Sequence, residues 1–230
     1  PHGKKNWKSY FWEFLMLFLA VFCGFLAEYQ LEHQIEKQRA KEYALSLRRD
    51  ITADTLAYSI NIKNLNICVT KIESLIVLLG NKDEILNHTN DIYKLSLYAF
   101  IFPQNNPNES TIQQLLNSGS LRYFRSNGLI DSIKAYNNSI QLFKDFRQDI
   151  GALNLEFRKA QLRVIELNPL ITSISQTNFS KLENLNLDSM ANASNAQLMT
   201  SDQALIKEYA NWCALKKFYM ANTAKVFSSL

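Results

Sequence analysis

The sequence predicts an all-α protein: a single N-terminal transmembrane helix that continues into a long helix and an antiparallel extramembrane helical bundle. Three observations support this prediction. An apolar run opens the chain, apolar residues recur at helical spacing through most of the remaining sequence, and only 6 glycines and 4 prolines interrupt 230 residues. In no segment do apolar and polar residues alternate, as they do in strands, over a stretch bounded by turn-forming residues. We therefore expect long helices joined by short breaks.

The apolar run extends from Phe14 to Ala27 and reaches back to Tyr10 if Glu13 lies near the membrane interface. As a helix, residues 10–27 rise about 27 Å, close to the hydrocarbon thickness of about 30 Å. A cleaved secretory signal peptide is the alternative, because basic residues precede the run and its end at Ala27 resembles a cleavage region. The many aromatic residues in and around the run favour a retained anchor.

The charges that flank the run predict its orientation. Three lysines precede it directly: Lys4, Lys5 and Lys8. The first charges after it are acidic: Glu28, Glu32 and Glu36. Because positive residues favour the cytoplasmic side, we expect a cytoplasmic N-terminus and a C-terminal domain outside the cytoplasm. The predicted parts of the chain are a cytoplasmic tail at 1–9, the transmembrane helix at 10–27, a polar helical neck at 28–46 and a helical bundle outside the cytoplasm at 47–230.

Two features inside the run bear on function. Ala20, Cys23, Gly24 and Ala27 form a stripe of small residues at three- and four-residue spacing. Such a stripe lets helices approach closely in lipid, so it is a candidate site of transmembrane association, although small residues are also common in membrane helices. Glu13 is an intramembrane polar residue. An acid there is costly unless it snorkels, pairs in an oligomer or lines an ion pathway.

The long helix is expected to continue outward, because no glycine or proline interrupts Phe25 to Leu79. Beyond the neck, its apolar residues step by three and four apart from one gap filled by Asp54: Leu47, Ile51, Tyr58, Ile62, Leu65, Val69, Ile72, Ile76 and Leu79. Gly80 is suited to a left-handed cap at the end of this helix, and Asp83 to the N-cap of the next.

Further helices are predicted from the same spacing. We expect a second helix over 83–102, a short one over 110–116 with a capping box from Ser110 to Gln113, a long one after Gly128 that Pro169 stops, and a last one from Thr200 or Ser201. Residues 170–196 are expected to be short helix plus irregular chain. The predicted core positions of the two later long helices are Leu129, Ile133, Tyr136, Ile140, Phe143, Ile150, Leu153, Phe157 and Val164, and then Leu205, Tyr209, Trp212, Tyr219 and Val226.

The residues offer no catalytic, cofactor-binding or metal motif. There is no glycine-rich phosphate loop, nucleophile elbow or HExxH pattern. His88 and Asp91 lie one helical turn apart and could hold a cation, but a solvated polar face is the simpler interpretation. Cys68 and Cys213 are expected to be buried thiols, or a disulfide in an oxidising compartment. A net charge of +4 in a chain with 21 acidic residues does not indicate a nucleic-acid-binding surface.

Several stretches together resemble a broad family of single-pass helical proteins of Bacteroidota. They are Glu13 before the end of the run at Gly24 to Ala27, the charged segment 32–49 leading to Asp50 and Asp54, Ser118 to Leu121 followed by Leu129, Ile133 and Tyr136, and, more loosely, 202–211. The resemblance implies an inner-membrane anchor with a periplasmic helical domain. It implies no activity and brings no catalytic residues.

The sequence therefore predicts a non-enzymatic structural or interaction protein without cofactor. We expect the lipid bilayer as one partner, and self-association or membership of a larger membrane complex through a long amphipathic, coiled-coil-like rod. Two alternatives stay open: an ion-conducting homo-oligomer with Glu13 in the pathway, and a periplasmic ligand-sensing bundle.

Overall fold

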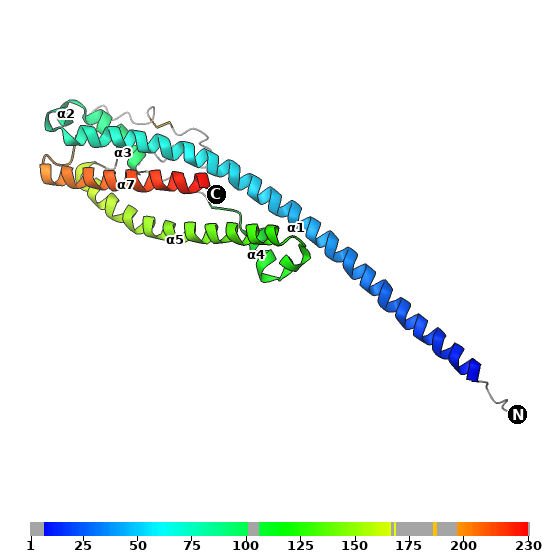
Figure 1. The fold of residues 1–230 in the computed structure, drawn as a ribbon. Helices are drawn as coiled ribbons and strands as arrows, with labels where there is room; N and C mark the ends of the chain where they lie inside the picture. Colours follow the sequence, from blue (N-terminus) through cyan, green and yellow to red (C-terminus); the bar gives the residue numbers. More distant parts are fainter. Residues whose placement is uncertain (1–6, 101–105, 167, 169–185, 188–196, 230) are drawn as a thin grey trace. The chain divides into compact units, whose positions relative to one another are not determined.

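The computed structural model describes residues 7–100, 106–166, 168, 186–187 and 197–229. Within these ranges every regular element is helical, as predicted, and none is a strand (Figure 1). In chain order the elements are α1 (Trp7–Gly80), α2 (Lys82–Asn87), α3 (Thr89–Phe100), α4 (Ser110–Asn117), the 3-10 helix η1 (Ser120–Tyr123), α5 (Asn127–Val164) and α7 (Gln203–Ser229).

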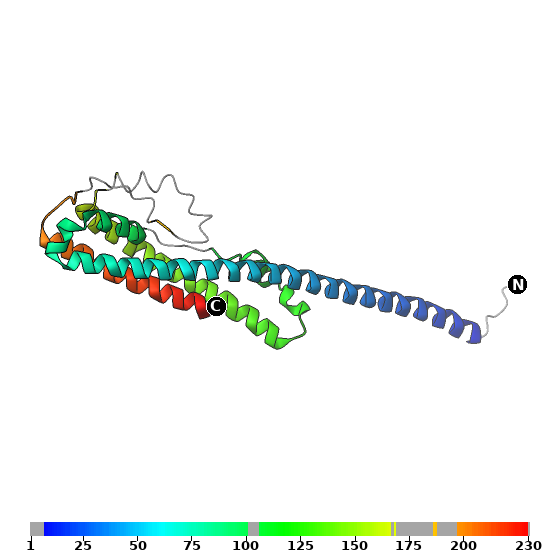
Figure 2. The ribbon, with the colours of Figure 1, turned by 90° about the horizontal axis from the view of Figure 1, so that it is seen from above.

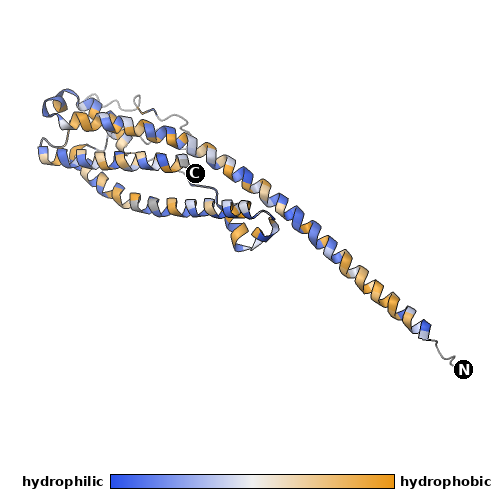
Figure 3. Cartoon of the chain, viewed as in Figure 1, coloured by the Kyte–Doolittle hydropathy of each residue, from blue (hydrophilic) through white to orange (hydrophobic). Residues whose placement is uncertain are grey.

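Helix α1 is one unbroken helix of 74 residues, which confirms the predicted continuity beyond the apolar run. In the described part of the chain it is the one helix that is long and apolar enough to cross a membrane by length and composition. Hydrophobic residues dominate its beginning and hydrophilic residues the next stretch, as the colouring of Figure 3 shows. The predicted polar neck is therefore continuous helix.

The described fold divides into two compact units, residues 1–50 with 109–133, and residues 51–108 with 134–230. In the first unit, the neck of α1 at residues 28–46 contacts the segment around η1. The Arg39 guanidinium donates a 3.2 Å hydrogen bond to the Tyr123 hydroxyl, and Arg125 lies 2.8 Å from Nε2 of His33. Both contacts are exposed, so each contributes little stability on its own.

The second unit is a helical bundle whose buried side chains form one core. Residues of α1, α3, α5 and α7 all contribute to it, and Figure 2 shows α1 and α7 side by side. Ring contacts join three of these helices. The Phe227 ring lies 4.9 Å from the rings of both Tyr58 and Phe143, measured between centroids. Aromatic pairs at this spacing add about 0.5–1.5 kcal/mol each beyond the area they bury.

Most of the predicted core residues are buried, but the prediction is wrong near the ends of the apolar stripes. Leu65, Ile72, Ile140 and Phe157 are buried as predicted. In contrast, three predicted core residues are exposed: Ile51, Leu129 and Val226. The helix period drifts over long stretches, so a face chosen at one end points away from the partner at the other. The predicted core positions also left out four buried residues: Leu75, Ile206, Met220 and Phe227.

The first helix boundary differs from the prediction. Gly80 ends α1 without a positive φ, and Asp83 lies inside α2 rather than capping it. Asn81 is the N-cap, since its Oδ1 accepts a 3.2 Å hydrogen bond from the Asp83 backbone N–H. Because the next helix begins after a single extended residue, a left-handed turn at Gly80 is not used.

Three further boundaries need correction. The predicted helix over 83–102 is two helices, because the chain breaks at His88, where φ is −119°. Glu109, not Ser110, is the N-cap of α4, and it makes no side-chain cap hydrogen bond. Helix α7 begins at Gln203, after Asp202, whose Oδ1 accepts a 2.8 Å hydrogen bond from the Ala204 N–H. The segment 170–196 lies almost entirely outside the described residues.

Candidate functional site

The small-residue stripe lies on the uncovered beginning of α1. Ala20, Cys23, Gly24 and Ala27 are all exposed in the single chain. A Cβ built on Gly24 would meet no heavy atom within 4 Å. This face of the helix is therefore open to another helix.

Glu13 lies on the same stretch of α1 and is exposed. Its neighbours in the chain, Trp12 and Phe14, are exposed apolar residues. The carboxylate therefore sits within an apolar surface of the single chain, as the sequence predicts.

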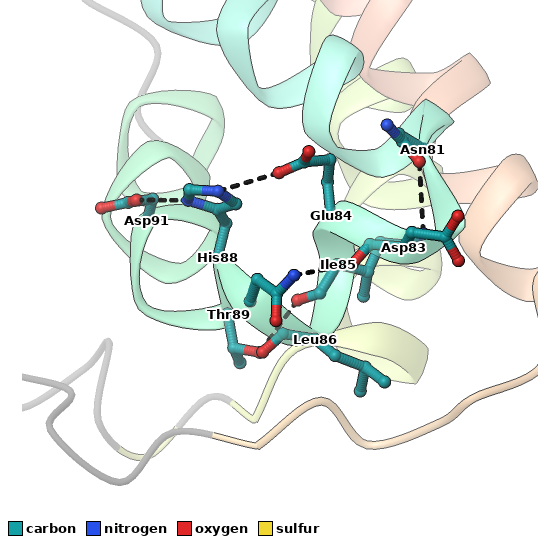
Figure 4. Close-up of polar contacts among 9 residues, drawn as sticks. Asn81, Asp83, Glu84, Ile85, Leu86, His88, Thr89 and Asp91 are labelled. Atoms are coloured by element: carbon teal, nitrogen blue, oxygen red, sulfur yellow. Dashed lines mark hydrogen bonds and ion pairs between the residues drawn. The ribbon is translucent and has the colours of Figure 1, made fainter.

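The His88 pair predicted from the sequence is present at the junction of α2 and α3. As Figure 4 shows, His88 lies between two carboxylates, with Nε2 2.8 Å from Glu84 and Nδ1 3.1 Å from Asp91. All three side chains are more than a third exposed. No group of three histidine, cysteine or acidic residues able to hold a metal ion occurs among the described residues. The cluster is an exposed group of polar contacts at the junction of α2 and α3.

A buried polar network joins three helices of the bundle core. The Tyr209 hydroxyl on α7 donates a 3.1 Å hydrogen bond to Oγ of Ser96 on α3. The Gln161 amide on α5 donates to the same hydroxyl at 3.2 Å and to the Ser96 carbonyl at 3.1 Å. All three side chains are buried. Because each buried polar group has a partner, the network specifies how α3, α5 and α7 pack.

Burial determines the protonation of this network. It raises the pKa of the Tyr209 hydroxyl well above its ordinary value. The neighbouring Cys213 thiol raises it further, whereas the hydrogen bonds with Ser96 and Gln161 oppose the shift. The phenol therefore stays neutral and acts as donor and acceptor, not as a base.

The most unusual group in the core is Lys216, one turn beyond Cys213 on α7. Its side chain is 6% exposed, and its Nζ has no hydrogen-bond partner in the described parts of the chain. The Nζ lies 4.3 Å from the centroid of the Phe157 ring, whose face attracts a cation. Burying an unpaired ammonium is nevertheless expensive.

Burial lowers the pKa of Lys216 to about 7, and the charge of Arg158 on α5 lowers it further. The thiols of Cys213 and Cys68 act in the opposite direction. No carboxylate is among the groups that shift this pKa. At neutral pH a large fraction of the Lys216 side chain is therefore the uncharged amine, in contrast to an ordinary lysine.

Cys68 and Cys213 are free, buried thiols, which agrees with the simpler of the two predictions. Burial raises the pKa of each thiol to about 12, while the charge of Lys216 lowers it. A thiol of this kind reacts slowly, because the thiolate is the nucleophile. The structure thus places both cysteines around the Lys216 amine but records no disulfide between them.

A cavity of about 20 Å³ lies beside this cluster, between α5 and α7. Lys216 lines it together with three aromatic rings, three aliphatic side chains and the amide of Asn154. A larger open hollow of about 890 Å³ lies elsewhere in the second unit, where α2 approaches the residues around Met199. That hollow is lined by mixed, largely surface side chains and gathers no buried ionisable group.

Sequence reasoning missed Lys216, Gln161 and Ser96. A signal for Lys216 was present, because Tyr209, Cys213, Lys216 and Met220 succeed one another at spacings of four, three and four. A lysine in an otherwise apolar helical stripe is a candidate buried amine. Gln161 and Ser96 carry no comparable signal, since a lone polar residue on a helix is usually solvated.

No protein-family model, curated protein or solved structure matches the chain. The candidate sites therefore rest on the residues and geometry of this chain.

Proposed function

We propose that the protein is a non-enzymatic, membrane-anchored helical protein that acts as a structural or interaction component, by self-association or as an accessory subunit of a larger membrane complex. The supporting observation is the beginning of α1, where none of an 18-residue apolar window is buried. Leaving one large apolar side chain in water forfeits about 1.5–3 kcal/mol. A stretch of this size needs a covering, and a bilayer fits its length.

In this proposal the start of α1 crosses the bacterial inner membrane with the N-terminus in the cytoplasm. The remaining helices form an antiparallel bundle in the periplasm, as the resemblance to the Bacteroidota family implies. Residues 28–46 form about 28 Å of continuous helix between the apolar run and the predicted bundle.

Anchoring is tested by washing membranes that contain the full chain with alkaline carbonate. We expect the wild type to stay in the pellet. Replacing Phe18 and Phe22 by lysine places two charges at the centre of the span and should release the protein. Leu86→Lys is the matched control, because Leu86 is 85% exposed on α2 and should not contribute to anchoring. Extraction of the wild type by carbonate would overturn the proposal.

Association is tested by measuring the mass of the protein purified in mild detergent. We expect either an oligomer of the chain or a stable complex with another membrane protein, through the face that contains Gly24. A monomer with no copurifying partner would contradict the proposed role while leaving the anchor intact.

A second candidate function is ion conduction by several copies of the chain. One observation favours it: Glu13 is exposed within the apolar surface of α1, where a carboxylate is costly unless it faces a partner or water. The test compares wild type and Glu13→Gln in a vesicle flux assay. Loss of flux in the variant would support a pathway at Glu13, and absence of flux from the wild type would exclude it.

A further inference from the structure

The segment that packs on the neck of α1 is positively charged. This α4–η1 segment, residues 110–130, contains Arg122 and Arg125 and neither aspartate nor glutamate. Both arginines are exposed. The Arg122 guanidinium lies over the Tyr123 ring, 5.3 Å from its centroid, and Arg125 contacts His33. Within the described residues neither arginine contacts a carboxylate, so the segment presents two cations to its surroundings.

A third arginine joins this cluster from α1. Arg39 donates a 3.2 Å hydrogen bond to the Tyr123 hydroxyl. The hydrogen bonds from Arg39 and Arg122, in this order, and the charges of both arginines lower the pKa of Tyr123. The phenol therefore lies in a positively charged environment to which two separate parts of the chain contribute.

Contacts along α1 place the cluster close to the apolar run. Tyr123 meets Arg39, and Arg125, two residues later in the chain, meets His33. The segment thus approaches the N-terminal end of α1 as it proceeds. His33 follows Ala27 by six residues, which is a rise of about 9 Å along the helix. Because side chains of a helix lean towards its N-terminus, the contact of His33 with Arg125 lies nearer to the run than the His33 backbone does.

With the proposed anchor in a bilayer, this level adjoins the lipid headgroups. The polar layer on each side of the hydrocarbon core is about 5–8 Å thick. An arginine side chain is long enough to extend its guanidinium into such a layer. Apolar side chains accompany the two arginines, because Leu121 and Phe124 are half-buried and Leu129 is exposed. Basic residues beside aromatic and aliphatic ones are typical of segments that lie at a membrane interface.

The acids of the neck lie on other faces of α1 or farther from the bilayer. In a helix of 3.6 residues per turn, Glu32 is about 100° and Glu28 about 140° around the axis from His33. Arg125 marks the His33 face as the one that the α4–η1 segment covers. Glu36 is only about 60° from His33, but it is about 14 Å beyond Ala27 along the helix. The positive charge of the segment therefore faces the membrane level without an acid beside it on the same face.

We propose that the α4–η1 segment docks on the membrane that holds α1, and that Arg122 and Arg125 bind anionic lipid headgroups there. The planar guanidinium of arginine pairs with phosphate oxygens through two parallel N–H donors. The inference rests on the proposed membrane anchor and adds a second lipid contact, with a stated lipid class, outside the span. Docking would hold the neck of α1 at the membrane surface from two sides.

The test places the full chain in nanodiscs of phosphatidylcholine, with and without about a third of phosphatidylglycerol. Asn127→Cys supplies an exposed labelling site beside the two arginines. Cys23→Ser removes the exposed native thiol, and the other two cysteines are buried. A fluorophore on residue 127 is quenched by lipid that carries a nitroxide on its headgroup. Quenching therefore reports how closely the segment approaches the membrane surface.

We expect about twofold stronger quenching with phosphatidylglycerol, because each arginine near an anionic surface favours binding by about fivefold. Salt at about 1 M should abolish the difference, since it shortens the Debye length to about 3 Å. Arg122→Gln combined with Arg125→Gln should lower quenching to the value in phosphatidylcholine alone. Replacing both arginines by lysine should restore it, which separates the effect of charge from that of the lost contact with His33.

Arg48→Gln combined with Arg49→Gln is the matched control. It removes the same charge from an exposed part of α1 that lies about 32 Å beyond Ala27 along the helix, several Debye lengths away. Quenching should then equal that of the wild type.

The outcomes separate this inference from the anchor. A chain that enters nanodiscs but shows equal quenching in both lipid mixtures would overturn the docking proposal and leave the anchor intact. Wild-type quenching in the variant with two glutamines would overturn it as well. A chain that does not enter nanodiscs would overturn both proposals.

Discussion

The hydroxyl of Tyr136 on α5 donates a 2.8 Å hydrogen bond to Oδ2 of Asp54 on α1. The backbone N–H of Asn108 donates to both oxygens of the same carboxylate at 3.0 Å. Asp54 is 5% exposed, so this buried anion is held by hydrogen-bond donors from two other parts of the chain. The relationship explains why the apolar stripe of α1 tolerates an acid at this position.

We expect Tyr136→Phe to lower the free energy of unfolding by about 1.5–3 kcal/mol, because it removes a hydrogen bond to a buried charged group. Denaturant titration in detergent, monitored by circular dichroism, measures the change. Tyr123→Phe is the control, since its hydroxyl accepts a hydrogen bond from Arg39 on the surface and its loss should leave the free energy of unfolding nearly unchanged. Equal losses in the two variants would contradict a buried Asp54–Tyr136 bond.

Lys216→Met should change how stability depends on pH. The folded-state pKa of Lys216 is about 7 and its ordinary value is 10.5, so between these values the unfolded chain binds more protons. Wild-type stability from this group therefore rises with pH from about 7 towards 10.5, by at most about 1.4 kcal/mol per pH unit, and is lost as the pH falls to 7. The variant lacks this slope and should be the more stable protein at neutral pH.

The buried thiols of Cys68 and Cys213 also contribute to the pH dependence of stability, and their contribution must be separated from that of Lys216. Their pKa is about 12 in the folded chain and 9 ordinarily, so their contribution is complete below pH 9 and falls as the pH rises towards 12. Between pH 7 and pH 9 the thiols therefore add no slope, and in this range the difference between the two proteins isolates Lys216. Parallel pH profiles of wild type and Lys216→Met in thermal unfolding would show that the amine is not buried in its neutral form.

Tyr209→Phe removes the hydroxyl at the centre of the core network. It leaves Gln161 and Ser96 short of a partner in the interior, which should cost about 1–3 kcal/mol of unfolding free energy. Combining it with Ser96→Ala gives a double-mutant cycle. We expect the two losses to be less than additive, because both variants break the same 3.1 Å bond. Strict additivity would mean that the residues do not interact.

Gly24→Leu should weaken association of the chain in detergent or lipid. The added side chain separates two helix backbones that approach closely at the small-residue stripe, with an expected loss of about tenfold in the association constant. Gly24 has open space around its Cβ position in the single chain, so the monomer itself should be unaffected. Analytical ultracentrifugation of wild type and variant measures this change. Gly151→Leu serves as the control, because Gly151 lies far along the chain on an exposed part of α5.

The long elements were predictable because their signals are local. An uninterrupted run of helix-forming residues gives α1, and apolar residues at three- and four-residue spacing indicate α5 and α7. The break at His88 was not predictable in the same way. Thr89 and its neighbours are compatible with a continuing helix, and the chain turns there because α3 packs against the bundle core through buried residues such as Ile92 and Tyr93.

The candidate site was less predictable than the helices. The sequence placed Cys68 and Cys213 on apolar helix faces, and the structure buries both. The sequence also marked Glu13 and Gly24 as unusual, and both are exposed on α1. It gave no partner for Asp54 and no reason to bury Gln161, since their contacts come from residues about 50–80 positions away in the chain.

The order of residues was enough to determine that this chain is helical, where its apolar opening lies and how far its first helix runs, because helix formation depends on neighbours within a few residues. The tertiary structure alone decided that the Lys216 amine is buried and that the buried Asp54 carboxylate accepts hydrogen bonds from distant parts of the chain. Whether a polar group meets water or protein depends on which distant helices close over it, and that information is not local in the sequence.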